Sequence, residues 1–131
     1  MIESNQQDGT RTFGGTGEGS AAASFRLGLA EAEAGRISRA LPLVERAVTL
    51  APTPQRLAQY ARLLSLGRRD GDAVRIARAA WALQPDDAHS LDTIGCVLAR
   101  VGDHQGSLAP FQAAVTREPD NLGFRYNLAA A

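Results

Sequence analysis

The fold is decided by residues 88–120, which read AHSLDTIGCVLARVGDHQGSLAPFQAAVTREPD. Large apolar residues in the first half recur at i, i+3 and i+7, a spacing typical of one face of an α-helix. These are Leu91, Ile94 and Leu98. Gly102-Asp103 interrupts the pattern, and an Asp at such a break can cap a following helix. Because Pro119 cannot continue a helix, the stretch predicts two helices, 88–100 and 105–117, joined by a tight turn.

The same arrangement occurs two more times upstream. Pro52, Pro85 and Pro119 are separated by 33 and 34 residues, and small residues recur in phase with them. The small residues are Gly28, Ala61 and Gly95; Ala40, Ala73 and Ser107; and Ala47, Ala80 and Ala114. A regular period of this length is the signature of a helical repeat. The small side chains are explained by antiparallel helices that cross closely, where larger groups would force the axes apart.

These periods define the expected organisation of the chain. We predict three repeats, at 21–53, 54–87 and 88–121, and the start of a further helix at 122–131. Residues 1–20 are rich in Gly and Thr and predict a flexible tail, because they cannot bury enough surface to offset their ordering entropy. The unfinished fourth unit leads us to expect that the chain is part of a longer protein.

The period and the phased positions resemble the tetratricopeptide repeat. That family has a small residue at position 8 of each repeat, which is Gly28, Ala61 and Gly95 here. It has Ala at position 20, which is Ala40, Ala73 and Ser107, and at position 27, which is Ala47, Ala80 and Ala114. Its Pro at position 32 is Pro52, Pro85 and Pro119, so this chain departs from these positions only at Ser107. The first repeat also departs from the pattern at Ser24 and Glu31, where large apolar residues are usual. The resemblance implies an all-α fold, a right-handed α-α superhelix or solenoid of antiparallel helix hairpins.

The resemblance also implies an interaction module whose concave groove, lined by first helices, binds a peptide or helix of a partner protein. Its groove positions fall here on Phe25, Leu29, Gln55, Arg62, Leu66, His89, Asp92, Cys96 and Arg100. Phe25 and Leu29 would form an apolar end, and an acidic group would bind between Arg62 and Arg100. The alternative is that Phe25 and Leu29 are covered by the tail, by another chain or by Leu66.

One subfamily binds the C-terminal carboxylates of heat-shock chaperones through a clamp of Lys, Asn and Arg residues. The matching positions here are Phe25, Leu29, Gln59, His89 and Thr93. None of them carries the clamp residue, so we predict no binding of such chaperone tails.

Composition excludes several classes of protein. Lys plus Arg and Asp plus Glu both number 14, so the formal charge is zero. A nucleic-acid partner is not expected, because such binding needs a net basic face. No apolar run approaches the roughly 20 residues of a membrane span, and the first residues do not form a signal peptide. We therefore expect a cytoplasmic protein with no membrane partner, whose single Cys excludes an intrachain disulfide.

Candidate chemical sites do not combine into an active site. His89, Asp92 and Cys96 are metal-ligand types on one helix face, but residues seven apart are separated by about 10.5 Å along the axis, and zinc needs further convergent ligands. Cys96 as a nucleophile would need a general base, and His89 is two turns away. We expect no metal, no cofactor and no catalytic residue, so the chain is interpreted as a non-enzyme.

Two other groups receive structural interpretations. The densest cationic cluster comprises Arg68, Arg69, Arg75 and Arg78, and we expect it to form a solvated face rather than a contact for a phosphate or an acidic protein. Trp81 is expected to pack in the core or between repeats rather than to stack on a ligand.

Two hypotheses for function follow. The first is an adaptor that binds a protein partner in its groove, with a homodimer as a further possibility. The alternative is the N-terminal recruiting domain of a larger enzyme, such as a bacterial sulfotransferase or glycosyltransferase, since such enzymes are similar in carrying these repeats ahead of a catalytic domain.

Overall fold

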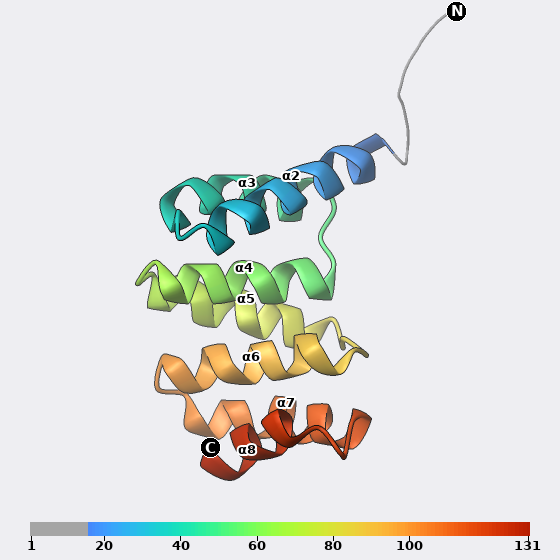
Figure 1. The fold of residues 1–131 in the computed structure, drawn as a ribbon, viewed down its shortest axis with the longest axis vertical. Helices are drawn as coiled ribbons and strands as arrows, with labels where there is room; N and C mark the ends of the chain where they lie inside the picture. Colours follow the sequence, from blue (N-terminus) through green and yellow to red (C-terminus); the bar gives the residue numbers. More distant parts are fainter. Residues whose placement is uncertain (1–15) are drawn as a thin grey trace, which may run out of the picture. The chain divides into compact units, whose positions relative to one another are not determined.

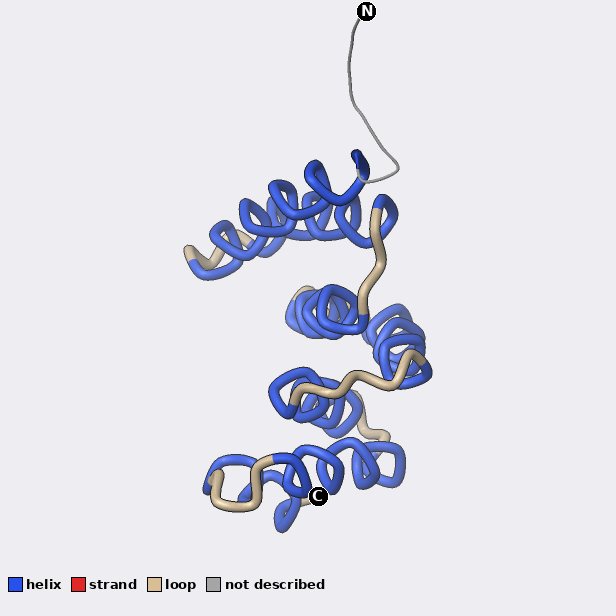
Figure 2. Tube along the Cα trace, turned by 90° about the vertical axis from the view of Figure 1, so that its right-hand side faces the viewer, coloured by secondary structure: helices blue, strands red, loops and turns tan. Residues whose placement is uncertain are grey.

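A computed structural model describes residues 16–131, and within that range the chain contains helices and loops but no strand (Figures 1 and 2). The helices are α2 (Thr16–Glu33), α3 (Ile37–Leu50), α4 (Pro54–Leu66), α5 (Asp70–Ala82), α6 (Ala88–Arg100), α7 (His104–Arg117) and α8 (Leu122–Ala130). The predicted all-α class is confirmed. The bounds of α6 match the sequence-based range of 88–100, and α7 begins one residue before the expected 105.

The chain divides into two compact units between Pro52 and Thr53. In the first unit, α2 and α3 pack together as a hairpin. Helix α2 begins at Thr16, so the prediction that the whole of 1–20 forms a flexible tail is wrong for its last five residues. The remainder of that predicted tail, residues 1–15, lies outside the described residues.

Ser24 occupies a position where the repeat pattern has a large apolar residue. Its Oγ donates a hydrogen bond of 2.7 Å to the backbone carbonyl of Leu43 on the facing helix. A polar contact therefore joins α2 to α3 at this level of the hairpin, which explains how the departure from the pattern is accommodated.

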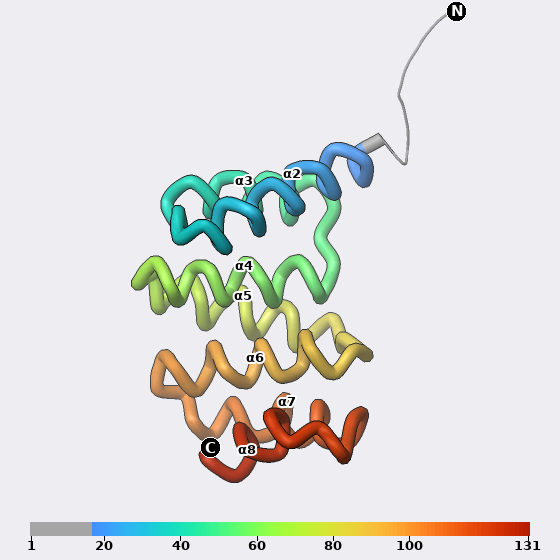
Figure 3. The backbone as a smooth tube through the Cα atoms, viewed as in Figure 1, coloured from blue at the N-terminus to red at the C-terminus, as the bar shows by residue number. Residues whose placement is uncertain are grey.

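The second unit consists of the hairpins α4–α5 and α6–α7, followed by α8. Helix α6 packs against α4 and α5 on one side and against α7 and α8 on the other. The continuous tube in Figure 3 shows α4 and α6 running side by side, each connected by a short turn to the second helix of its hairpin.

Polar side chains fix the starts of four helices in this unit. The Asp103 carboxylate accepts a hydrogen bond of 2.9 Å from the Gly106 N–H at the start of α7, so its predicted role as an N-cap is confirmed. Thr53, Asp87 and Asn121 accept equivalent bonds at the starts of α4, α6 and α8. Each cap satisfies a backbone donor that has no partner within its helix.

The phased small residues lie where helices approach most closely. Ala47, Ala80 and Ala114 are each completely buried, so the three repeats share one environment at this position. A Cβ atom added to Gly95 would lie 2.5 Å from Cδ1 of Phe111, well inside ordinary contact distance. A Cβ at Gly28 would meet Cγ2 of Val44 at 2.6 Å. Glycine therefore allows the close crossing of the two helices in both hairpins.

The turn inside each hairpin uses one residue with a left-handed backbone. This residue is Gly35 in the first hairpin and Gly102 in the third, with φ of +82° and +95°. At the equivalent place in the middle hairpin stands Arg68, with φ of +66°. Because a side chain is disfavoured in this region, the middle turn is strained where the other two are not.

Candidate functional site

A hollow of about 200 Å³ lies between the neighbouring first helices α4 and α6. Its lining is contributed by Arg62, Ser65, Asp92, Thr93, Cys96, Val97 and Arg100. Ser65, Thr93 and Val97 are buried and form its inner part. The structure thus brings Arg62 and Arg100, the two residues expected to hold an acidic group, to the edge of one cavity.

The α4 side of this hollow is held by a chain of side-chain hydrogen bonds. Gln59 accepts a bond of 2.8 Å from Nε of Arg62, while its amide nitrogen lies 3.4 Å from Nε2 of His89 on α6. Further along the same pair of helices, Gln55 donates a bond of 2.8 Å to Asp87. These contacts limit the side-chain freedom of Arg62 before any ligand binds, which lowers the entropic cost of binding.

The α6 side of the hollow is linked to α8 through Asn127. Its amide nitrogen lies 3.0 Å and 3.3 Å from the two carboxylate oxygens of Asp92 and 3.6 Å from Sγ of Cys96. A second hollow of about 290 Å³ lies here and shares Cys96 and Arg100 with the first. The two cavities therefore form one surface that runs over α4, α6 and α8.

Cys96 is unsuited to nucleophilic chemistry. Burial of the thiol, together with the nearby charge of Asp92 and the hydrogen bond to it, raises the Cys96 pKa to about 11, and the opposing influence of Arg100 does not compensate. The thiol is therefore protonated at neutral pH, whereas reactive cysteines have a depressed pKa.

The other predicted groove residues are distributed more widely. Gln55, Leu66 and His89 are exposed on α4 and α6, outside the lining of the hollow. Phe25 and Leu29 are half-buried on α2 in the first unit, and the role predicted for them stays a prediction.

Sequence reasoning did not assign Gln59 or Asn127 to the site. Gln59 falls at a clamp position where the clamp residue is missing, so the family pattern gave it no binding role. Asn127 lies 35 residues after Asp92, about one repeat along the chain, and this spacing is the available signal that the two side chains could meet on adjacent helices.

The alternative chemical sites are not assembled in the described part of the chain. Among residues 16–131, no three His, Cys, Asp or Glu side chains converge on a possible metal position. His89 is turned to Gln59, whereas Asp92 and Cys96 share Asn127.

Three of the four arginines in the cluster form ion pairs. Arg69 and Arg75 pair with Asp72 at 2.7 Å and 3.3 Å, and Arg78 pairs with Asp103 at 3.0 Å. The hydrogen bonds from Arg69 and Arg75 lower the pKa of Asp72, and the hydrogen bonds from Arg78 and from the Gly106 N–H lower the pKa of Asp103. Arg69 and Arg75 share one carboxylate, so these ion pairs do not cancel the positive charge of this surface.

A helix that crosses a bilayer must be both long and apolar. Not one of the helices between residues 16 and 131 combines the length and the apolar character that this demands.

Comparison with known proteins identifies sequence relatives of this chain. Human tetratricopeptide repeat protein 7A is 30% identical over 89 residues, which make up 67% of this chain and 10% of that protein. The chain thus spans about a tenth of the length of the curated relatives it matches. No protein-family model matches it.

Solved structures show the same fold at low sequence identity. The TPR domain of Arabidopsis OM64 gives a TM-score of 0.75 at 13% identity and covers 87% of this chain and 95% of that domain. YrrB, described as a TPR protein with an unusual peptide-binding site, gives 0.69 at 19% identity over 82% of this chain and 56% of that one. Both share with this chain a fold built of antiparallel helix hairpins.

Proposed function

Because this chain belongs to the tetratricopeptide repeat family, we propose that it is a non-catalytic interaction module that binds a peptide or helix of a partner protein along α4, α6 and α8. The peptide-binding site described for YrrB supports this proposal, since that protein shares the fold. Fold alone names no partner, so the chemistry of the partner is argued from the side chains around the hollow.

The observation that carries the proposal is the pair of arginines at one cavity. Arg62 approaches from α4 and Arg100 from α6, and within residues 16–131 Arg100 makes no ion pair. The one carboxylate in the lining, Asp92, already accepts hydrogen bonds from Asn127. The guanidinium group of Arg100 therefore stands at the hollow without an ion pair within the described residues, which suits an acidic side chain of the partner.

The apolar part of the partner follows from the family's groove positions on α2. We propose, from the family's groove positions, that Phe25 and Leu29 on α2 contact an apolar part of the partner. An apolar anchor and an acidic group on one peptide would then give both affinity and orientation, because buried apolar contacts supply energy and paired charges supply specificity.

A peptide selection tests the proposal and does not require a known partner. A random peptide library displayed on phage is selected on the whole chain, and the enriched peptides are measured by fluorescence anisotropy. We expect them to contain Asp or Glu. We also expect Arg100→Gln to weaken their binding by about tenfold, since a hydrogen bond to a charged group is worth about 1.5–3 kcal/mol.

Arg75→Gln is the matched control, because Arg75 lies on α5 and pairs with Asp72 away from the hollow. This variant should retain the affinity of the unmodified chain. Enrichment of peptides without acidic residues, or equal losses in both variants, would show that the two arginines do not define the site.

The recruiting-domain alternative and the homodimer remain proposals. The first is supported by the relatives, in which the matching segment is a small part of a much longer chain. The sequence of the complete gene tests it, because a catalytic domain would be evident there. Light scattering over a range of concentrations tests the homodimer.

A further inference from the structure

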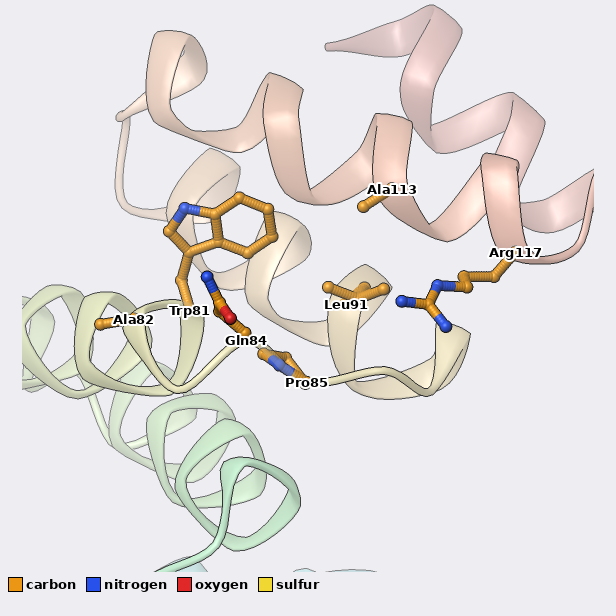
Figure 4. A pocket seen from close by; sticks show the side chains of 7 residues that line it. All are labelled: Trp81, Ala82, Gln84, Pro85, Leu91, Ala113 and Arg117. Atoms are coloured by element: carbon orange, nitrogen blue, oxygen red, sulfur yellow. The ribbon is translucent and has the colours of Figure 1, made fainter.

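A third hollow lies between the end of α5, the start of α6 and α7, and it shares no lining residue with the other two. It measures about 510 Å³, and Figure 4 shows the side chains that surround it. Trp81 and Gln84 come from the end of α5 and its following loop, Leu91 from α6, and Ala113 and Arg117 from α7. Sequence reasoning expected Trp81 to pack between repeats, but 37% of its surface is exposed.

The inner part of this hollow is apolar. Leu91, 2% exposed, lies at its centre in Figure 4, with Pro85 buried beside it. The six-membered ring of Trp81 is turned to the side on which Leu91 and Ala113 lie. A large apolar side chain placed here would contact the indole, the leucine and the alanine together, and burial of apolar surface of this kind favours binding.

The edge of the hollow carries hydrogen-bond donors. The guanidinium group of Arg117 points from α7 towards Leu91, and among residues 16–131 it forms neither an ion pair nor a hydrogen bond. At the opposite edge Gln84 has a left-handed backbone, with φ of +56°, and its amide lies next to Trp81. Since such a conformation is unfavourable for a residue with a side chain, Gln84 is a strained position at the border of the cavity.

We propose that this hollow is a second peptide-binding site, which accepts a large apolar side chain followed by Asp or Glu on a partner protein. The apolar side chain would lie against Trp81, Leu91 and Ala113, and the carboxylate would pair with Arg117. The site is independent of the function proposed for the first helices, because it uses none of the same residues.

The volume of the hollow and the residues that line it support a large apolar side chain followed by Asp or Glu as its occupant. Sites that bind small ligands measure about 300–1,000 Å³, so the hollow can hold one large side chain and its neighbouring backbone. Trp and Arg are also the residues that most often dominate the energy of protein interfaces. An unpaired guanidinium group beside an apolar cavity complements an acidic residue adjacent to an apolar one.

The single tryptophan of the chain makes the test specific, because every change in indole signal reports on Trp81. The probe is an acetylated, amidated hexapeptide with Phe-Glu between Gly-Ser and Ser-Gly, titrated to about 5 mM, where a ligand of this size is expected to bind. Binding is followed by tryptophan fluorescence and by the indole N–H resonance in nitrogen-15 NMR spectra. Two further probes replace Phe-Glu by Phe-Gln or Ala-Glu.

We expect a saturable response to the Phe-Glu probe and affinities about tenfold weaker for the other two probes, reflecting loss of the charged bond or the apolar contact. Arg117→Gln should remove the preference for Phe-Glu over Phe-Gln, whereas Arg100→Gln should leave it unchanged. The comparison of probes on the unmodified chain needs no variant and so does not depend on folding of a mutant.

Several results would overturn the proposal. These are no saturable Trp81 signal with any probe, equal affinity for Phe-Glu and Phe-Gln, and full retention of the preference in Arg117→Gln. A Trp81 signal that changes with protein concentration in the absence of peptide would show that a second copy of the chain occupies the hollow instead. Loss of binding in Arg100→Gln would place the probe at the first-helix cavity.

Discussion

Substituting Gly95 by Ala tests the close crossing of α6 and α7 with a single methyl group. The added Cβ would lie 2.5, 2.6 and 2.9 Å from three ring carbons of Phe111. Carbon atoms in contact are normally about 3.5–4.0 Å apart, so the ring would have to retreat by about 1 Å. Phe111 is only 3% exposed, and the surrounding core leaves little space for that movement.

Two opposing contributions determine how Gly95→Ala changes the free energy of unfolding. Overpacking a buried site costs about 1–3 kcal/mol, while replacing Gly by Ala inside a helix contributes about 0.8–1.0 kcal/mol of stability. We therefore expect Gly95→Ala to lower the free energy of unfolding by about 1 kcal/mol, which corresponds to a fall in Tm of roughly 4–8 °C for a domain of 60–100 residues. Urea and thermal unfolding, followed by far-UV circular dichroism, measure the change.

Gly71→Ala is the matched control in α5, because nothing lies within 4 Å of its added Cβ. It should be neutral or stabilise by up to about 1 kcal/mol. Adding Phe111→Leu to Gly95→Ala should recover part of the loss, with a coupling energy of about 0.5 kcal/mol or more. If Gly95→Ala proves as stable as Gly71→Ala, the described contact between Gly95 and Phe111 is incorrect.

The remaining predictions concern a turn, a cap and a core alanine. Arg68→Gly should raise the free energy of unfolding by about 0.5–1 kcal/mol, because glycine tolerates the left-handed backbone at this turn. Gly102→Ala should lower the free energy of unfolding for the same reason. Urea unfolding of both variants measures the two changes, and a loss of stability in Arg68→Gly would contradict the prediction. Burial works to raise the pKa of Asp87, but hydrogen bonds from Gln55 and Ser90 outweigh it and lower that pKa below 3.8. The charged form of Asp87 therefore stabilises the fold above about pH 4, and this contribution is lost as the pH falls through the lowered pKa. Asp87→Asn should be less stable than the unmodified chain at pH 7, and the difference should shrink as the pH falls through the lowered pKa; a difference that stays the same in urea unfolding at pH 7 and at acidic pH would exclude this role. Ala80→Leu should destabilise by about 1–3 kcal/mol, whereas the same change at exposed Ala79 should be nearly neutral, and equal Tm values would refute the repeat register.

Most of the helical arrangement could be predicted from the sequence, because it depends on spacing. Small residues in phase place the crossings, and Gly102-Asp103 places a turn and a cap, so the bounds of α6 follow directly. The start of α2 could not be predicted in this way. Its first turn contains Gly17, which lowers intrinsic helix propensity, yet this turn lies beside α3, where a Cβ added at Gly17 would be 3.5 Å from the Leu50 carbonyl oxygen. Tertiary packing outweighs propensity there.

The candidate site was predictable only in part for a related reason. Repeat positions place Arg62 and Arg100 on equivalent faces of adjacent first helices, and the structure brings both to one cavity. The bonds through Gln59 and Asn127 depend on side-chain rotamers and on the offset between helices, which a period does not specify. The exposure of Trp81 has the same origin, since it depends on the space that α5 and α7 leave around Leu91.

Asp87 makes two connections with one carboxylate. One oxygen accepts the Ser90 N–H that begins α6, and the other accepts the side-chain amide of Gln55 on α4. Fraying of the first turn of α6 would therefore also weaken the bond that Gln55 on α4 makes to Asp87, which couples the starts of the two helices. In hydrogen exchange the early amides of α6 should gain or lose protection together with those of α4. The Asp87 carboxylate would then couple the local opening of one repeat to that of its neighbour.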